Sequence, residues 1–205
     1  MLLELFTILE TNGLFPNLET YRNFSESVGE SIKHKYVCSY YWREISVPYP
    51  GLWNHVWRKN NLLHRVDGPA REWVNGAKSW YQNGVRHRVD GPAVEHSNGT
   101  KHWYQNGVLH RVDGPAVEYS NGGKCWYQNN KRHRIDGPAI EYANGTKEWY
   151  QNNILYRIDG PVIEYADGTK EWWENNKRHR IDGPAIEWGN GHKEWWVNGN
   201  KIDPF

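Results

Sequence analysis

The sequence predicts an all-β protein, built as a single-layer, solenoid-like array of antiparallel β-hairpins with 23-residue repeats and a small helical N-terminal cap. Three observations predict this class. One motif recurs at constant spacing, Asn-Gly or Asn-Asn pairs punctuate each repeat, and aromatic and β-branched residues fill the segments between them. The 205 residues include 13 Trp and 13 Tyr, so the core must rely on buried aromatic rings.

The repeat is marked by Asp-Gly-Pro, which recurs every 23 residues (90 − 67 = 23). The six units start at Asp67, Asp90, Asp113, Asp136, Asp159 and Asp182. No insertion interrupts the array, so the units must be geometrically equivalent and stacked on one another. A period of this length is too short for a strand–helix–strand unit. We therefore divide the chain into a non-repeat segment, residues 1–52, and a hairpin array, residues 53–205.

Two turns are predicted inside each unit. In the unit from 138 to 159 they are Asn144-Gly145 and Asn152-Asn153, and both residue types tolerate the left-handed backbone that tight turns need. Identical translated units need an even number of chain reversals, so we expect the Asp-Gly-Pro segment to be a kink. Each unit would contribute two antiparallel strands and advance the array by about 9–10 Å.

An aromatic pair in each unit predicts two aromatic columns, because adjacent side chains of a strand point to opposite faces. The first column, predicted as a structural ladder, comprises Trp57, Trp80, Trp103, Trp126, Trp149, Trp172 and Trp195. The second comprises Tyr81, Tyr104, Tyr127, Tyr150, Trp173 and Trp196. A single layer cannot bury both, so the second column is the candidate binding surface. The alternative is that Lys and Arg stems cover it and nothing binds.

Histidines also recur in one column, a residue type that can bind metal. The distance between successive repeats argues against a shared metal site. The column comprises His64, His87, His110, His133 and His179, with Tyr156 in the remaining unit. Zinc ligands must lie about 2.0–2.1 Å from one ion, whereas equivalent atoms of successive units are about 9–10 Å apart. We predict no metal ligand and add these histidines to the structural ladder, each ring bonding a neighbouring loop.

Charged residues also recur in register. An Arg precedes each Asp-Gly-Pro by one spacer, which predicts an Arg–Asp clamp at the kink. Glu72 to Glu187 and Lys78 to Lys193 flank the Asn-Gly turns, and we expect exposed cross-strand Glu–Lys pairs worth about 0–1 kcal/mol each. Columns of identical residues provide no cleft with paired carboxylates, or with a nucleophile and its base. We therefore predict no catalytic residue, no cofactor and no enzymatic activity.

Charge and hydropathy narrow the classes of partner and the cellular location that we expect for the protein. Lys plus Arg number 25 and Asp plus Glu 24, a balance that argues against a nucleic-acid partner and gives no indication of lipid contact. The mean hydropathy of −0.92 excludes a transmembrane segment. The two cysteines lie far apart in the sequence, and the first ten residues lack the features of a secretory signal. We expect a cytoplasmic protein or a virion component.

The segment 1–52 lacks the period. Apolar residues at helical spacing predict two helices, one ending near Gly13 and one over 18–32. We expect a mainly helical cap or docking segment. The segment also resembles an F-box, with residues 2–6 as its opening helix and Val37-Cys38 and Trp42-Arg43 in a later one. That resemblance implies a substrate adaptor for ubiquitin ligation.

The array itself resembles the MORN repeat family, in the degenerate YwqK-like form found in bacteria, phages and large DNA viruses. The likeness covers residues 57–205 and is carried by the Asn-Gly turn with its following Lys, the aromatic pair, and Lys131-Arg132-His133, repeated at 177–179. The family's Tyr-x-Gly and Gly-x-Gly positions are replaced by Trp-Tyr and Arg-x-Asp-Gly-Pro.

What the MORN resemblance implies is a scaffold for protein–protein interaction or self-association, binding through the aromatic face or the N-terminal segment, in a viral or phage protein. Aromatic ladders on hairpin repeats also resemble carbohydrate- and choline-binding modules, in which aromatic cages hold the ligand.

Overall fold

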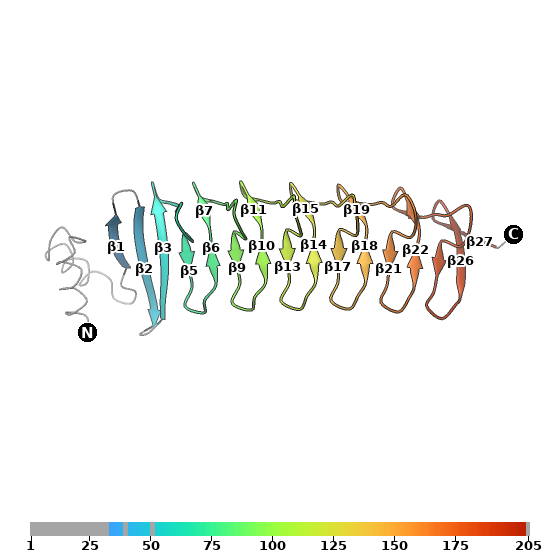
Figure 1. The fold of residues 1–205 in the computed structure, drawn as a ribbon, viewed down its shortest axis with the longest axis horizontal. Coiled ribbons are helices and arrows are strands. Elements are labelled where there is room, and N and C mark those ends of the chain that lie inside the picture. Colours follow the sequence, from blue (N-terminus) through green and yellow to red (C-terminus); the bar gives the residue numbers. More distant parts are fainter. Residues whose placement is uncertain (1–32, 39–40, 50–51, 204–205) are drawn as a thin grey trace. The chain divides into compact units, whose positions relative to one another are not determined.

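The structure is a computed structural model that describes residues 33–38, 41–49 and 52–203 (Figure 1). These residues contain strands, turns and bends but no helix, which confirms the predicted all-β class. The chain divides into two compact units, residues 1–97 and 98–205, and each is described by itself. Within the described residues, no helix is long and apolar enough to cross a membrane.

The described part of the first unit begins with three antiparallel strands, in which β2 pairs with both β1 and β3. The repeat that starts at Asp67 and the first residues of the next repeat follow, and β3 pairs with β5 of the first repeat. The strands of this unit are β1 (Lys33–Cys38), β2 (Tyr41–Tyr49), β3 (Leu52–Lys59), β4 (Leu62–Leu63), β5 (Arg71–Glu72), β6 (Lys78–Ser79), β7 (Tyr81–Gln82), β8 (Val85–Arg86) and β9 (Val94–Glu95).

The strands β1 and β2 lie within residues 1–52, the segment predicted as a mainly helical cap or docking segment. Residues 33–38 and 41–49 contain aromatic and β-branched residues, among them Tyr36, Val37, Ile45 and Val47, and these residue types favour strand. The F-box resemblance assigns Val37-Cys38 and Trp42-Arg43 to a later helix, whereas both segments lie in strands. The two predicted helices, ending near Gly13 and over 18–32, lie outside the described residues.

The second unit consists of repeats (Figure 1). Its strands are β10 (Lys101–His102), β11 (Tyr104–Gln105), β12 (Val108–Leu109), β13 (Val117–Glu118), β14 (Lys124–Cys125), β15 (Tyr127–Gln128), β16 (Lys131–Arg132), β17 (Ile140–Glu141), β18 (Lys147–Glu148), β19 (Tyr150–Gln151), β20 (Ile154–Leu155), β21 (Ile163–Glu164), β22 (Lys170–Glu171), β23 (Trp173–Glu174), β24 (Lys177–Arg178), β25 (Ile186–Glu187), β26 (Lys193–Val197) and β27 (Asn200–Ile202).

Each full repeat contributes four short strands instead of the predicted two. In the repeat that starts at Asp136, β17 and β18 form a hairpin in a long antiparallel sheet, whereas β19 and β20 form a small sheet of their own. The long sheet continues because β14 pairs with β17 and β18 pairs with β21. The predicted continuous strand is broken at Trp149, whose backbone N–H donates to the carbonyl of Val162 instead.

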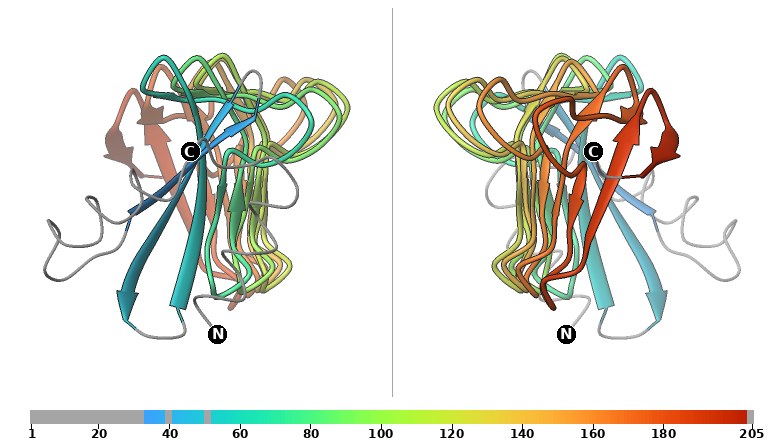
Figure 2. Two further views of the ribbon diagram at one scale, coloured as in Figure 1. Left: turned by 90° about the vertical axis from the view of Figure 1, so that its left-hand side faces the viewer. Right: turned by 90° about the vertical axis from the view of Figure 1, so that its right-hand side faces the viewer.

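The two turns have the predicted chemistry. Gly145 has φ of 93°, and Asn152 and Asn153 have φ of 52° and 69°, so left-handed backbone occurs at all three positions. Two consecutive positive φ values are typical of the type I′ hairpin turn. The Asp-Gly-Pro segments are bends between the two kinds of hairpin, as predicted. Figure 2 shows the turns of successive repeats in the second unit one behind another.

The core of the second unit is made from Ala, Val and Ile with Cys125, and not from the buried aromatic rings that the composition predicted. Ala116, Ala139 and Ala185 are fully buried, and Val117, Cys125 and Ile140 form one cluster. Because little aliphatic volume is buried, side-chain hydrogen bonds also join neighbouring repeats. The hydroxyl of Thr146 accepts a bond from the Ala166 backbone N–H at 3.2 Å.

Candidate functional site

The tryptophan column is covered by the chain's own arginines. The Arg134 guanidinium lies 4.1 Å from the centre of the Trp126 ring and donates to Asp136 at 3.1 Å, to the Pro138 carbonyl at 3.3 Å and to Glu141 at 3.2 Å. The cation–π contact recurs for Arg65 on Trp57, Arg88 on Trp80, Arg111 on Trp103, Arg157 on Trp149 and Arg180 on Trp172. These rings are therefore unavailable as an open cage.

The Arg–Asp clamp predicted at the kink is confirmed in most repeats. The bond from Arg134 holds the pKa of the exposed Asp136 carboxyl below its usual value. Arg157 instead donates to Glu164 at 2.6 Å. The predicted placement of each Glu opposite its Lys is confirmed, as for Glu141 and Lys147, but among the described residues these side chains form no ion pair. Glu141 bonds Arg134 because the guanidinium is already held over Trp126 beside it.

The histidine column joins successive second turns. The Asn129 backbone N–H donates to Nδ1 of His110 at 3.3 Å, and the same nitrogen lies 3.0 Å from the Asn129 side-chain oxygen. Equivalent contacts join His64 to Asn83, His133 to Asn152 and His179 to Asn198. In the described residues no group of three or more His, Cys, Asp or Glu side chains lies close enough to hold a metal ion.

The second aromatic column has different neighbours from the first. Tyr81, Tyr104, Tyr127, Tyr150, Trp173 and Trp196 are all half-buried. In the second unit, a further set of aromatic residues, more exposed, accompanies them. These are Tyr119, Tyr142, Tyr165 and Trp188, with exposed fractions of 47%, 45%, 38% and 39%.

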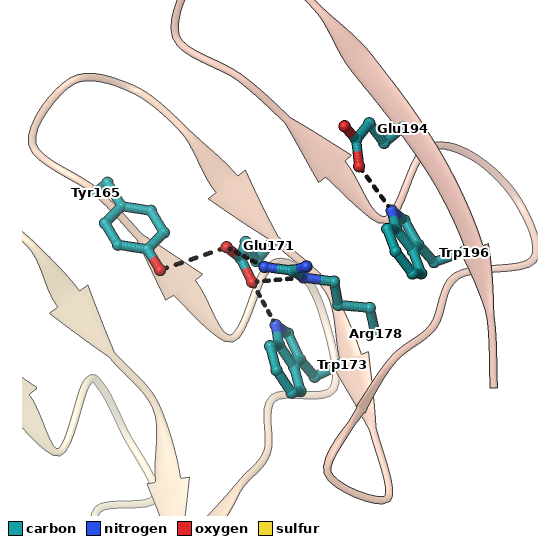
Figure 3. A network of polar contacts seen from close by, with 6 residues as sticks. All are labelled: Tyr165, Glu171, Trp173, Arg178, Glu194 and Trp196. Carbon is teal, nitrogen blue, oxygen red and sulfur yellow. Dashed lines mark hydrogen bonds and ion pairs between the residues drawn. The ribbon is translucent and has the colours of Figure 1, made fainter. Parts of the chain in front are cut away.

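The two sets meet through glutamates, as the repeat of Glu171 shows (Figure 3). Glu171 is only 4% exposed. It accepts hydrogen bonds from the Tyr165 hydroxyl at 3.3 Å and from the Trp173 indole N–H at 2.7 Å. The Arg178 guanidinium completes the network, with Nε 3.3 Å from one carboxylate oxygen and Nη2 3.4 Å from the other.

The neighbouring repeats use the same arrangement. Tyr142 donates to Glu148 at 3.1 Å, and burial, with the Glu148 carboxylate next in effect, raises the pKa of Tyr142 to about 12. Trp196 donates to Glu194 at 2.9 Å, and Lys201 lies 3.2 Å from that carboxylate.

We call the eight residues of both sets in these repeats the aromatic strip: Tyr119, Tyr127, Tyr142, Tyr150, Tyr165, Trp173, Trp188 and Trp196.

Sequence reasoning identified half of the strip. The exposed half was missed because the residue after each Glu is Trp, His or Tyr without a fixed type, so it does not form a column of identical letters. Alternation along the strand could have placed the exposed half. Tyr142 follows Glu141 and therefore shares the face of the buried Ile140.

A second exposed feature was also missed. The residue before each Asp-Gly-Pro is always Val or Ile, a choice that in a repeat usually indicates core. It is nevertheless exposed throughout, at 66–84%: Val66, Val89, Val112, Ile135, Ile158 and Ile181. Periodicity identifies these residues but not their exposure.

A scan against protein-family models gives no match for this chain, and no curated protein is similar to it at a significant level.

Proposed function

We propose that the protein is a non-enzymatic scaffold that binds a partner protein along the aromatic strip. The observation that carries this proposal is the exposure of Tyr119, Tyr142, Tyr165 and Trp188 in the second unit, next to half-buried rings. Tyr and Trp are the residues most enriched in protein interfaces, and contiguous exposed apolar patches mark interaction sites. The resemblance to MORN repeats supports the same class of function.

The chemistry of the strip favours a protein over a small cation. Arg178 already lies 5.5 Å from the ring centres of Trp173 and Trp196, and Arg132 lies 4.8 Å from that of Tyr150. The aromatic faces in these repeats therefore hold internal guanidinium groups. A protein partner can instead contact the exposed parts of Tyr119, Tyr142, Tyr165 and Trp188.

Photo-crosslinking tests the proposal. We expect p-benzoylphenylalanine at position 142 or 165 to crosslink the same protein in an extract of the source cells. The control is position 147 in β18, which lies opposite Glu141 in the register and next to Glu148, and therefore points to the other face of the sheet from Glu148. Light scattering of the purified chain identifies the partner as a second copy if the mass is doubled. Equal crosslinking from positions 142 and 147, or none from position 142, would contradict the proposal.

A further inference from the structure

Two repeats of the second unit differ at one key position. Cys125 stands 46 residues before Glu171 (171 − 125 = 46), two periods earlier, and the other members of the Glu171 network are present at the same offset. They are Tyr119 for Tyr165, Tyr127 for Trp173 and Arg132 for Arg178. The earlier repeat therefore retains the arginine and the hydroxyl that bind a carboxylate, but lacks the carboxylate itself.

The space that a carboxylate would need is open in this repeat. A hollow of about 380 Å³ is lined by Tyr119, Cys125, Tyr127 and Arg132. Gly123 also lines it, at a position where the flanking repeats of the second unit have Thr100 and Thr146. The hollow thus arises where glycine replaces threonine and cysteine replaces glutamate. Its volume is at the small end of ligand sites and leaves room for a side chain.

The electrostatics of the hollow favour an anion at one end. In the described residues, Arg132 has no carboxylate within 4 Å. Burial acts to lower its pKa, but the Tyr150 and Tyr127 hydroxyls outweigh burial and raise it, so the guanidinium keeps its charge. The Tyr119 hydroxyl lies beside the Cys125 thiol, whose pKa is raised mainly by burial, so the thiol is neutral near pH 7.

Two glutamates lie near the hollow. Glu141 lines it, but its carboxylate accepts a bond from Arg134 at 3.2 Å. Glu148 belongs to the next repeat, raises the pKa of Cys125 through its charge, and accepts the Tyr142 hydroxyl bond. Neither carboxylate occupies the place that Glu171 takes beside Arg178.

We propose that this hollow binds a carboxylate of the partner protein, an aspartate or glutamate side chain, at the place that corresponds to the Glu171 carboxylate. Arg132 donates to its oxygens with the guanidinium, and Tyr119 donates with the hydroxyl. Charge-assisted bonds from an arginine are strong and directional, which makes the hollow a specific contact within the aromatic strip. The inference rests on the proposed function, because the carboxylate belongs to the partner protein that the aromatic strip binds.

The test is an NMR titration of the full chain with glutamate blocked as its N-acetyl and N-methylamide derivative. We expect the Arg132 side-chain Nε–H signal and the Gly123 amide signal to shift, with a dissociation constant on the order of 1–10 mM. The matched control ligand is blocked glutamine, which has the same shape without the charge, and it should cause no saturable shift.

Two variants use residues that the array already tolerates at these positions. Cys125→Glu supplies the carboxylate from within, as at Glu171, and Arg132→Leu removes the cation, as at Leu109 and Leu155. Each should weaken glutamate binding at least tenfold, whereas Glu148→Gln should strengthen it by removing a nearby negative charge. Equal shifts with glutamine, or unchanged glutamate binding in both variants, would overturn the inference.

The crosslinking experiment separates the two proposals. Cys125→Glu should reduce crosslinking of the partner from position 142 several-fold. Unchanged crosslinking in Cys125→Glu would overturn the carboxylate contact and leave the scaffold function standing. Glutamate binding without any crosslink from the strip would overturn both the scaffold function and the assignment of the carboxylate to a protein.

Discussion

At the scale of single residues, charged side chains supply stabilising contacts that the small core does not. Glu171 is buried, and its side chain is acceptable there only because three donors surround it. Buried carboxylates that lose their cation destabilise the fold, since desolvation is then no longer offset. Arg132 has the same position in its repeat as Arg178 but no buried carboxylate beside it, which makes the two arginines a matched pair.

We expect Arg178→Leu to lower the free energy of unfolding by about 3 kcal/mol, because it leaves the Glu171 carboxylate buried without a cation. Arg132→Leu should cost less than about 1 kcal/mol, because no buried carboxylate loses its partner. Urea unfolding followed by Trp fluorescence measures both. Adding Glu171→Cys to Arg178→Leu should recover most of the loss, and equal costs for the two single variants would contradict this account.

The Arg–Asp clamps make the stability of the fold depend on pH in the acidic range. Hydrogen bonds from Arg134 to Asp136 lower the pKa of the Asp136 carboxyl in the folded state, and Asp67, Asp90, Asp113 and Asp182 are affected by arginine in the same way. A group whose pKa is lower in the folded state contributes stability above its unfolded pKa, here about 3.9, and that stability is lost as the pH falls through the folded value.

The contribution of the clamps to the thermal unfolding midpoint should therefore be constant between pH 5 and 7 and be lost below about pH 4. Arg134→Gln removes one clamp, and carboxyl NMR should then show the pKa of Asp136 rising toward 3.9. A pKa of Asp136 that does not move on this substitution would assign its shift to the backbone instead of to the arginine.

At the scale of elements, turns show how much sequence can predict. The two hairpin turns follow from Asn and Gly, because few other residues adopt positive φ. The break at Trp149 does not follow, because each strand residue has an extended preference and only the bond of its N–H to Val162, distant in sequence, decides the bend. The hollow at Cys125 could not be predicted either, since its opening depends on which side chains reach across from neighbouring strands.

Adjacent glycines in one turn test this account. Gly122 has φ of 92° with nothing near the position of an added Cβ, whereas Gly123 has no positive φ and corresponds to Ala77 in the first repeat. We expect Gly122→Ala to cost about 1–2 kcal/mol from backbone strain alone. Gly123→Ala should change stability by less than about 0.5 kcal/mol. The difference in urea midpoints measures this, and a larger effect at Gly123 would mean that packing, not φ, decides the turn.

At the scale of the whole molecule, period and composition predicted the all-β hairpin array because identical units can bury surface only against one another. They did not predict the strands at Lys33–Cys38 and Tyr41–Tyr49, which have no repeated register to support an assignment. Period and composition also did not predict which side chains are exposed. The Val or Ile before each Asp-Gly-Pro has the periodicity of a core residue, yet Ile135 is 80% exposed, because the bend turns its side chain outward.

Equivalence of the repeats predicts that one can be removed whole. Deleting residues 136–158 removes one period (158 − 135 = 23) and brings β14 next to β21, whose Ile163 and Glu164 replace Ile140 and Glu141 in the pairing. Stability of a repeat array is roughly a sum of repeat and interface terms, so circular dichroism should retain the same β signal per residue with a slightly lower unfolding midpoint.

The control deletion of residues 136–147 removes half a period and should abolish cooperative unfolding, because buried and exposed positions then oppose one another. The whole-repeat deletion should also keep the hollow, since Tyr165 takes the place of Tyr142 at its edge while Arg132 and Cys125 stay. Binding of blocked glutamate by that shortened chain would show that the contact belongs to a single repeat junction. A folded shortened chain that no longer binds glutamate would instead place an essential part of the site in residues 136–158.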